Sequence, residues 1–237
     1  MPRFFVDKER IKQCLHIVGD DAKHIGVLRM SPGDEITVTD GGYVYSCRID
    51  SIEKEEVIVS VVDYTVIDTE PAVTVTLFQG IPKATKMDIV IQKAVELGVS
   101  EIVPVITERS VAMPGGNRVE RWRKISEAAA KQSNRGIIPK IHAPTNLETA
   151  ARMSERLCES YVAWELENDI SASTVFSGSR GETVGIIIGP EGGFSNDEIS
   201  MLRQRGVKTF SLGKRILRTE TAGFVALICL MIHRGEI

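Results

Sequence analysis

The chain has 237 residues, 29 basic and 32 acidic side chains, a formal net charge of −3, and 43 % hydrophobic residues. This length and balance allow a sizeable buried core and exclude a chain that is disordered or collagen-like throughout. Four cysteines and four histidines are scattered without a C-x-x-C pair, so neither a zinc site nor a disulfide framework is indicated.

Two segments bear on where the protein works. Asp7–Arg10 is a run of charged residues where a secretory signal would need an apolar core, so we expect a cytoplasmic protein. The longest apolar stretch, Thr221–Ile232, is shorter than the roughly 20 residues of a membrane-spanning helix. It therefore predicts a buried helix, with no membrane partner.

The first 70 residues are predicted to be rich in β-structure. Three β-branched runs, at Glu35–Thr39, Tyr43–Asp50 and Glu56–Val62, predict strands of a small sheet or barrel. Asp20–Arg29 is the exception, because its apolar spacing predicts a short helix.

After Asp68–Pro71 the pattern changes to alternating strands and helices, which predicts an α/β domain with a mainly parallel sheet. We place the boundary near residue 70, which gives domains 1–70 and 71–237. The predicted strands are Val73–Phe78, Ile102–Val105, Tyr161–Trp164, Val184–Ile188 and Val207–Leu212. The predicted helices are Met87–Leu97, Arg118–Asn134, Leu147–Glu159 and Glu220–His233.

Charge is distributed unevenly along the chain. Residues 1–70 hold 8 basic and 14 acidic side chains, residues 71–140 hold 11 and 6, and residues 141–237 hold 10 and 12. The cations of the middle third could neutralise nucleic-acid phosphates, or they could form an ordinary solvated helix face. The sequence does not decide between these two interpretations.

The turn Gly189–Phe194 is the most informative segment. Its three glycines permit positive φ and a close approach of backbone to a ligand, and Ser195 with Glu198 forms a capping box for the next helix. The turn follows a predicted strand, and ligands of α/β sheets bind beyond the carboxyl ends of strands. The alternative is a tight turn with a structural role alone.

A second loop, Leu212–Gly223, leads from the last strand into the final helix, so two strand ends offer two loops to one cleft. Thr219 or Thr221 as the helix cap is its structural alternative. G-x-G-x-x-G, a P-loop, G-x-S-x-G and H-E-x-x-H are all absent, which disfavours a dinucleotide, P-loop or hydrolase site.

Gly189–Phe194 and Leu212–Ala222 together resemble the paired signatures of the ribosomal-RNA uridine N3-methyltransferases, the RsmE family of the SPOUT class. Similar motifs at Arg3–Phe5, His24–Asp34, Met87–Gly98 and Glu127–Arg135 extend the resemblance over nearly the whole chain. The resemblance implies a PUA-like β-barrel that binds RNA at 1–70, a SPOUT α/β domain with a deep trefoil knot at 71–237, and a homodimer.

The family resemblance also implies the substrate and the site. The expected reaction is methylation of N3 of a uridine in 16S ribosomal RNA, within the small ribosomal subunit, with S-adenosylmethionine as cofactor. The residues expected to bind the cofactor are Gly189, Pro190, Glu191, Gly192, Leu212, Gly213, Ile216, Leu217, Arg218, Thr219 and Ala222. The residues expected to bind RNA are Arg3, Lys23, Arg29, Lys83, Lys86, Gln132 and Arg135.

Uridine N3 carries a proton, so it becomes a good nucleophile only when that proton is lost or the resulting anion is stabilised. We hypothesise that Arg218 stabilises this negative charge, and its structural alternative is an ion pair with Glu220 or Glu191. The target base must leave its stack, and we expect it in a pocket near Gln132 and Arg135. No metal is required.

Two departures and two competing functions stay open. Relatives often have a Lys-Gly-Asp type of loop where this chain has Lys83–Asp88, and residues 1–70 are acidic overall. One competing function is a non-catalytic RNA-binding module. The other is a SPOUT methyltransferase that acts on transfer RNA or on ribose 2′-hydroxyls, because one fold supports several targets.

Overall fold

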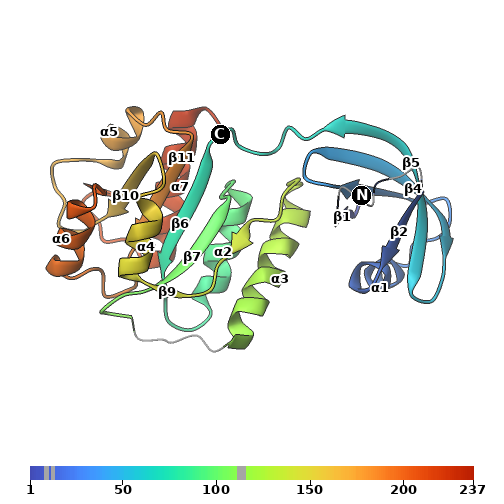
Figure 1. Cartoon of the computed structure of the whole chain (residues 1–237), viewed down its shortest axis with the longest axis horizontal. Coiled ribbons are helices and arrows are strands. Elements are labelled where there is room, and N and C mark those ends of the chain that lie inside the picture. Colours follow the sequence, from blue (N-terminus) through green and yellow to red (C-terminus); the bar gives the residue numbers. More distant parts are fainter. Residues whose placement is uncertain (8–10, 12–13, 111–115) are drawn as a thin grey trace. The chain divides into compact units, whose positions relative to one another are not determined.

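The computed structural model describes residues 1–7, 11, 14–110 and 116–237 (Figure 1). Most of the charged run Asp7–Arg10 therefore lies outside the described residues. Contacts divide the chain into two compact units. The first contains Met1–Glu70 together with Ala130–Ile137, and the second contains Pro71–Ala129 together with Ile138–Ile237.

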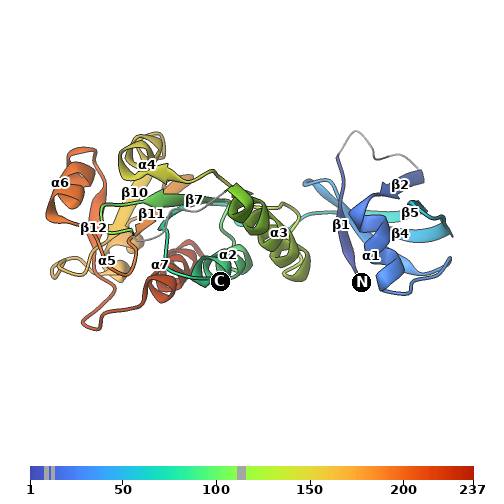
Figure 2. The same ribbon diagram turned by 90° about the horizontal axis from the view of Figure 1, so that it is seen from below.

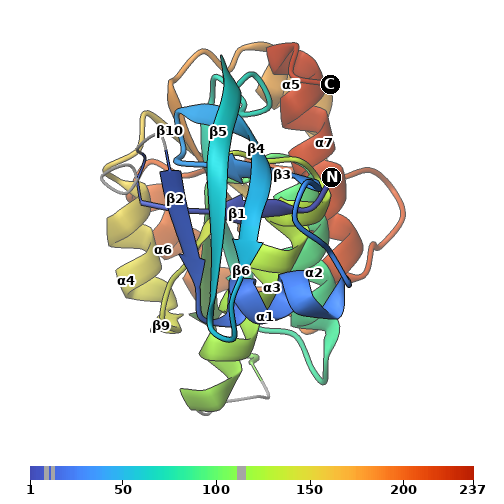
Figure 3. The same cartoon turned by 90° about the vertical axis from the view of Figure 1, so that its right-hand side faces the viewer.

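The first unit is built on a five-stranded sheet with the order β1-β3-β4-β5-β2. The pair β1–β3 is parallel and the other pairs are antiparallel. The bounds are β1 Arg3–Phe5, β2 Cys14–Val18, α1 Asp20–Val27, β3 Glu35–Thr39, β4 Tyr43–Ile52 and β5 Glu56–Val66. Figure 3 looks onto β2, β5 and β4. The three predicted strands and the helix are confirmed, whereas the short strands β1 and β2 were not predicted.

Alternating apolar residues form the core of this unit. Phe4 is fully buried, as are Ile36 and Val38 of β3, and all three lie in one cluster with Ile25 of α1. The hairpin between β3 and β4 is closed by Asp40, whose carboxylate accepts hydrogen bonds from the backbone N–H of Gly42 (2.9 Å) and Tyr43 (2.8 Å). These contacts explain why a chain of short β-branched runs forms one sheet.

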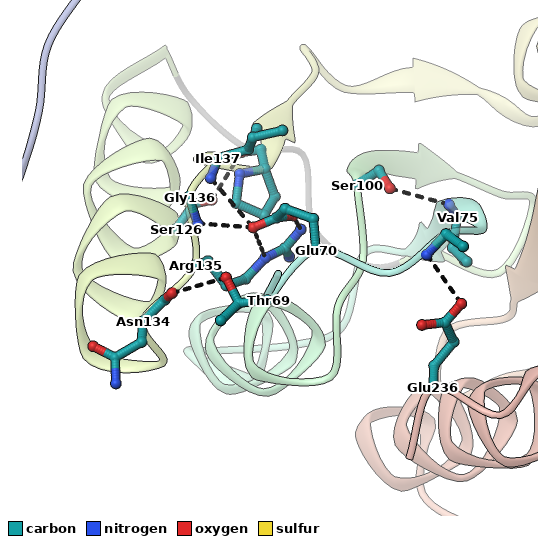
Figure 4. Close-up of polar contacts among 12 residues, drawn as sticks. Thr69, Glu70, Val75, Ser100, Ser126, Asn134, Arg135, Gly136, Ile137 and Glu236 are labelled. Atoms are coloured by element: carbon teal, nitrogen blue, oxygen red, sulfur yellow. Dashed lines mark hydrogen bonds and ion pairs between the residues drawn. The ribbon is translucent and has the colours of Figure 1, made fainter. Parts of the chain in front are cut away.

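Residues 130–137 belong with the first unit because Glu70 binds them. The Glu70 carboxylate accepts hydrogen bonds from the Arg135 guanidinium, from the backbone N–H of Gly136 (2.9 Å) and from that of Ile137 (3.3 Å) (Figure 4). The Thr69 hydroxyl also donates to the carbonyl of Asn134 (3.0 Å). The expected boundary near residue 70 would instead assign this segment to the second domain.

The second unit contains a sheet of seven strands in which every pair is parallel, as predicted. The order is β12-β10-β11-β6-β7-β8, and β9 also pairs with β7. The bounds are β6 Thr74–Gly80, β7 Glu101–Ile106, β8 Lys140–Ile141, β9 Thr145–Asn146, β10 Glu159–Ala163, β11 Thr183–Ile188 and β12 Lys208–Phe210. The carboxyl ends of β10, β11 and β12 therefore lie side by side.

Helices cover both faces of this sheet (Figure 2). The bounds are α2 Lys86–Glu96, α3 Gly116–Gln132, α4 Leu147–Ser154, α5 Ala172–Ser177, α6 Asn196–Gln204 and α7 Thr219–Arg234. Leu147 of α4 and Leu202 of α6 share a core cluster with Phe78 and Ile187 of the sheet. On the opposite face, α7 packs against α2 and α5.

One expectation about a helix needs correction. The helix predicted for Leu147–Glu159 ends at Ser154, because Glu159 begins strand β10. The final helix was expected to be buried on most faces, and within α7 only Ile228 (36 %) and Ile232 (55 %) are exposed. Among the helices of the described residues, none combines the length and the apolar character that crossing a membrane requires.

Candidate functional site

A cavity of about 350 Å³ opens at the carboxyl ends of β10, β11 and β12. This volume falls within the roughly 300–1,000 Å³ that is typical of small-molecule sites. The structure brings every residue that was expected to bind the cofactor into the wall of this one cavity. The lining residues are Ala163, Trp164, Glu165, Ile188, Gly189, Pro190, Glu191, Gly192, Gly193, Phe194, Ser211, Leu212, Gly213, Arg215, Ile216, Leu217, Arg218, Thr219 and Ala222.

The turn after β11 is shaped by close backbone approaches. A Cβ atom at Gly80 would lie 2.5 Å from the backbone nitrogen of Pro190, so strand β6 touches the turn only because residue 80 is glycine. Gly193 has a φ of 65° and donates its N–H to the carbonyl of Pro190 (3.0 Å). The predicted capping box of Ser195 and Glu198 is confirmed at the start of α6. The segment is thus a tight turn that also lines the cavity.

A buried chain of hydrogen bonds ties the two loops together from behind the cavity. Gln79 in β6 is fully buried, and its Nε2 donates to Thr219 Oγ1 (2.9 Å). The Thr219 hydroxyl in turn donates to the carbonyl of Gly189 (2.6 Å). Because the single hydroxyl proton is used on Gly189, Thr219 can only accept from Gln79, which fixes the orientation of the Gln79 amide.

The expected helix-capping role of Thr219 or Thr221 needs correction. The N-cap residue of α7 is Arg218, and no side chain caps it. Thr219 makes a hydrogen bond to the other loop instead, so its hydroxyl joins two loops rather than ending one helix. This is a tertiary contact over 30 residues of sequence, which local capping rules do not predict.

Glu191 turns its carboxylate toward Lys86 and the backbone of Lys83. Lys86 Nζ lies 2.8 Å from Glu191 Oε1 and 3.7 Å from Glu220 Oε2, and the N–H of Lys83 donates to Glu191 (3.2 Å). Burial alone would raise the pKa of Glu191, but the hydrogen bonds from Lys86 and from backbone N–H groups outweigh it, and the net pKa is lowered. The hydrogen bond to Glu191 is also the largest influence on Lys86, whose pKa is raised.

Arg218 lines the cavity and is exposed. Within the described part of the chain it forms no ion pair, since Glu191 and Glu220 both contact Lys86. The charge of Arg218 opposes the rise in the pKa of Lys86, so the two cations lie near each other. The structural alternative for Arg218, an ion pair with one of these carboxylates, is therefore not found.

Backbone donors are available at the rim of the cavity. Among the residues that the structure describes, the N–H groups of residues 214–217 have no protein acceptor. Trp164 also lines the cavity, and its indole Nε1 is buried without a hydrogen-bond partner among the described residues. The N–H groups of residues 215–217 belong to residues that line the cavity, so they can donate to a polar ligand there. No group of three or more His, Cys, Asp or Glu side chains suited to a metal ion occurs in the described residues.

The residues expected to bind RNA do not lie together at this cavity. Arg135 is 4 % exposed and is bound by Glu70, so its location argues against RNA contact. The Arg3 guanidinium donates to the carbonyls of Asn134 and Arg135. Lys86 contacts Glu191 and Lys23 contacts Asp20. Three side chains are exposed and make no such contact with the part of the chain that the structure describes: Arg29, Lys83 and Gln132.

Two parts of the site were missed in the sequence. The last residue of β10, Ala163, and the loop residues Trp164 and Glu165 that follow it line the cavity. Trp164, an aromatic residue at the end of a predicted strand, could have indicated this third loop. Gln79 was missed as well, and the signal was a polar side chain directly after the apolar strand predicted for Val73–Phe78.

Comparisons with known proteins agree with this geometry. A family model described as RNA methyltransferase domain matches residues 69–231, and one described as RNA methyltransferase PUA domain matches residues 17–62. The chain is 32 % identical to the ribosomal RNA small subunit methyltransferase E of Bacillus subtilis, over 96 % of this chain and 94 % of that protein. It is 30 % identical to the protein of the same name from Aquifex aeolicus, over 97 % and 98 % of the two chains.

Solved structures give the same match. The crystal structure of ribosomal RNA small subunit methyltransferase E from Neisseria gonorrhoeae bound to S-adenosyl methionine has a TM-score of 0.88 and 30 % identity, covering 98 % of this chain and 97 % of that one. A putative methyltransferase from Legionella pneumophila, in complex with the same cofactor, has a TM-score of 0.86 and 30 % identity, covering 97 % and 96 %.

Proposed function

Since this chain belongs to the ribosomal RNA small subunit methyltransferase E family, we propose that it methylates N3 of a uridine in the 16S RNA of the small ribosomal subunit, using S-adenosylmethionine. The observation that carries the proposal is the single cavity formed by the loops after β11 and β12, which hold the two family signatures. A protein acting on this RNA would work in the cytoplasm.

The cavity fits S-adenosylmethionine in its chemistry. Apolar walls from Ile188, Leu212, Leu217 and Ala222 suit an adenine ring and a thioether-like chain. The N–H groups of residues 214–217 suit acceptors such as ring nitrogens, ribose hydroxyls and a carboxylate. These residues would hold the cofactor, and the relay from Gln79 through Thr219 to Gly189 would keep its two loops in register.

When bound, S-adenosylmethionine supplies a methyl group on a positively charged sulfur, which becomes a neutral thioether as N3 takes the methyl group. The chain's own contribution is to hold the base and to favour the charge that forms on it. Arg218 lies at the cavity wall and pairs with no carboxylate of the described residues, so its charge is available for the uracil oxygens as N3 loses its proton to solvent. Holding the reactants in line lowers the barrier further.

The architecture of the two domains follows from the same family. We propose that residues 1–70 form a PUA-like β-barrel that binds RNA, and that residues 71–237 form a SPOUT domain with a deep trefoil knot. Support for the knot is that α7 starts under the turn after β11, with Thr219 bonded to Gly189, although β12 is at the edge of the sheet. True knots are rare in proteins, and topology rules alone would not predict one.

We also propose a homodimer. Ile228 and Ile232 of α7 and Ile89 of α2 are exposed, and α2 packs against α7. These exposed apolar side chains support the homodimer that the family resemblance implies. Analytical ultracentrifugation should give twice the mass of one chain, and a single-chain mass at micromolar concentration would reject the dimer.

The decisive experiment is methyl incorporation from labelled S-adenosylmethionine into small ribosomal subunits that lack the modification, with the modified nucleoside identified by mass spectrometry. We expect N3-methyluridine in 16S RNA. Methylation of transfer RNA or of a ribose 2′-hydroxyl would move the protein to another SPOUT activity. A protein that binds RNA but shows no S-adenosylmethionine binding by calorimetry would be a non-catalytic module.

A further inference from the structure

The loop between β12 and α7 carries positive charge that forms no ion pair with any residue the structure describes. Lys214, Arg215 and Arg218 are exposed within five residues of chain, and none of them forms an ion pair in the described part of the molecule. Lys86 Nζ contacts the carboxylates of Glu191 at 2.8 Å and Glu220 at 3.7 Å. Figure 3 shows this loop projecting outward beside α7. The rim of the cavity is therefore cationic.

The proposed cofactor does not account for these charges. S-adenosylmethionine carries a sulfonium, an ammonium and one carboxylate, so its net charge is positive. Its single carboxylate can pair with at most one of the three cations. The whole chain has a net charge of −3, so unpaired cations gathered beside one cavity are also a local departure from its composition. These cations therefore indicate an anionic ligand other than the cofactor.

Ile216 adds an exposed apolar side chain to this cationic loop. It lies between the cations and lines the cavity, yet 81 % of its surface is exposed. An exposed apolar side chain beside cations can contact a base of a single strand while the cations bind its phosphates. Bases of single-stranded RNA are splayed out and packed on protein side chains, whereas the phosphates are bound by Lys and Arg.

We propose that Lys214, Arg215 and Ile216 form a contact strip for the RNA strand next to the target uridine. The two cations would bind phosphates, and the Ile216 side chain would lie against a neighbouring base. The inference rests on the proposed function, because it requires that RNA be the substrate. It also changes the set of RNA contacts, since Arg135 is buried against Glu70 and Lys86 is bound to Glu191.

The test is the salt dependence of binding to unmodified 16S RNA transcribed in vitro, measured by filter binding. The double variant Lys214→Gln/Arg215→Gln should bind about tenfold or more weakly. Its slope of log K against log[KCl] should be shallower by about 1.4–1.8, because two phosphate contacts are lost. Ile216→Ser should weaken binding without changing the slope. The matched control is Lys208→Gln/Arg180→Gln, which removes two exposed cations elsewhere in the second unit and should leave the slope nearly unchanged.

The possible results separate failure of the contact strip from failure of the proposed function. An unchanged slope in the loop variant, or an equal change in the control variant, would overturn the contact strip. So would a fall in the mass of the assembly on mutation, because the loop would then be a contact between two copies of the chain. RNA binding is measured without S-adenosylmethionine, so that a change in the cofactor affinity of the loop variant does not enter the result. Failure of the wild-type protein to bind the cofactor or to methylate the RNA would reject the proposed function instead.

Discussion

Arg218 is the side chain on which the proposed chemistry depends most directly. It lies in the cavity wall, at the first residue before α7, and has no ion-pair partner in the described residues. An unpaired cation beside a reaction centre is available for charge that develops only in the transition state. Lys86 is also near, but its ammonium group is held between two carboxylates.

Replacing Arg218 with Ala should therefore lower kcat by about 100- to 1,000-fold, the usual loss when one preorganised charge-stabilising group is removed. The affinity for S-adenosylmethionine, measured by calorimetry, should change little because the charge acts on the base. Arg218→Lys, which keeps the charge but loses the planar fork, should recover part of the rate. Turnover close to wild type in Arg218→Ala would remove this residue from the reaction.

Gln79 is a residue whose importance is visible only in three dimensions. Its amide is fully buried, and it reaches the Gly189 turn through the hydroxyl of Thr219. The Gln79 Oε1 atom has no hydrogen-bond partner among the described residues, and a Cβ atom at Gly223 would lie 3.2 Å from it. The Gln79 amide therefore acts in the relay through its Nε2 donor and not through Oε1.

Gln79→Met should lower the free energy of unfolding by about 1–3 kcal/mol, because it leaves buried groups of the relay unpaired. It should also weaken S-adenosylmethionine binding, since the two loops are no longer tied. Thr219→Val tests the same relay from the other side. If the relay acts as a unit, the double variant should cost less than the sum of the single variants by about 0.5–3 kcal/mol. Additive losses in both stability and cofactor affinity would contradict this role.

At the scale of elements, the sequence was sufficient to predict those features that depend on residues close together in the chain. The capping box at Ser195 depends on a residue three positions away, and the strand Glu35–Thr39 depends on its own β-branched residues. The start of α7 was predicted to within one residue, but the role of Thr219 could not be predicted in the same way. Thr219, the first residue of α7, is held by Gln79 and Gly189, which lie 140 and 30 residues away in sequence.

The turn after β11 gives a prediction about pH. The pKa of Glu191 is lowered in the folded protein, so its contacts contribute stability at pH values above the ordinary glutamate pKa of about 4.3 and lose it as the pH falls through the lowered value. Glu191→Gln should thus lower the free energy of unfolding by about 0.5–1.5 kcal/mol at neutral pH. Urea denaturation at a series of pH values should show the difference from wild type shrinking below pH about 4.

Lys93→Gln, which removes an exposed i,i+3 pair with Glu96, is the matched control for loss of a surface ion pair. It should cost less than about 0.5 kcal/mol. If Glu191→Gln shows an equally small effect, or a difference that grows toward acid, the carboxylate does not hold the turn. The pH series is needed because the neutral-pH value alone would not separate a charge effect from a packing effect.

At the scale of the whole molecule, residues 130–137 group in space with a different unit from the one that their place in the chain suggests. The sequence places this segment 60 residues beyond the predicted boundary, and its cations looked available for RNA. In the structure Arg135 is 4 % exposed and its charge is matched by Glu70, which is 65 residues earlier. A basic residue bound in this way has the same appearance in the sequence as one that faces a phosphate, so composition could not separate the two.

The pairing predicts how the first unit responds to mutation. Arg135→Met leaves the Glu70 carboxylate without its guanidinium partner, and breaking a buried pair costs about 3–5 kcal/mol because the remaining charge is uncompensated. Hydrogen exchange should show loss of protection in strands β1 to β5, whereas S-adenosylmethionine, whose proposed cavity is lined by the second unit alone, should still bind. Glu70→Gln/Arg135→Met removes both charges and should recover part of the protection. Loss of cofactor binding in Arg135→Met, or no recovery in the double variant, would show that the pair does not act within the first unit in this way.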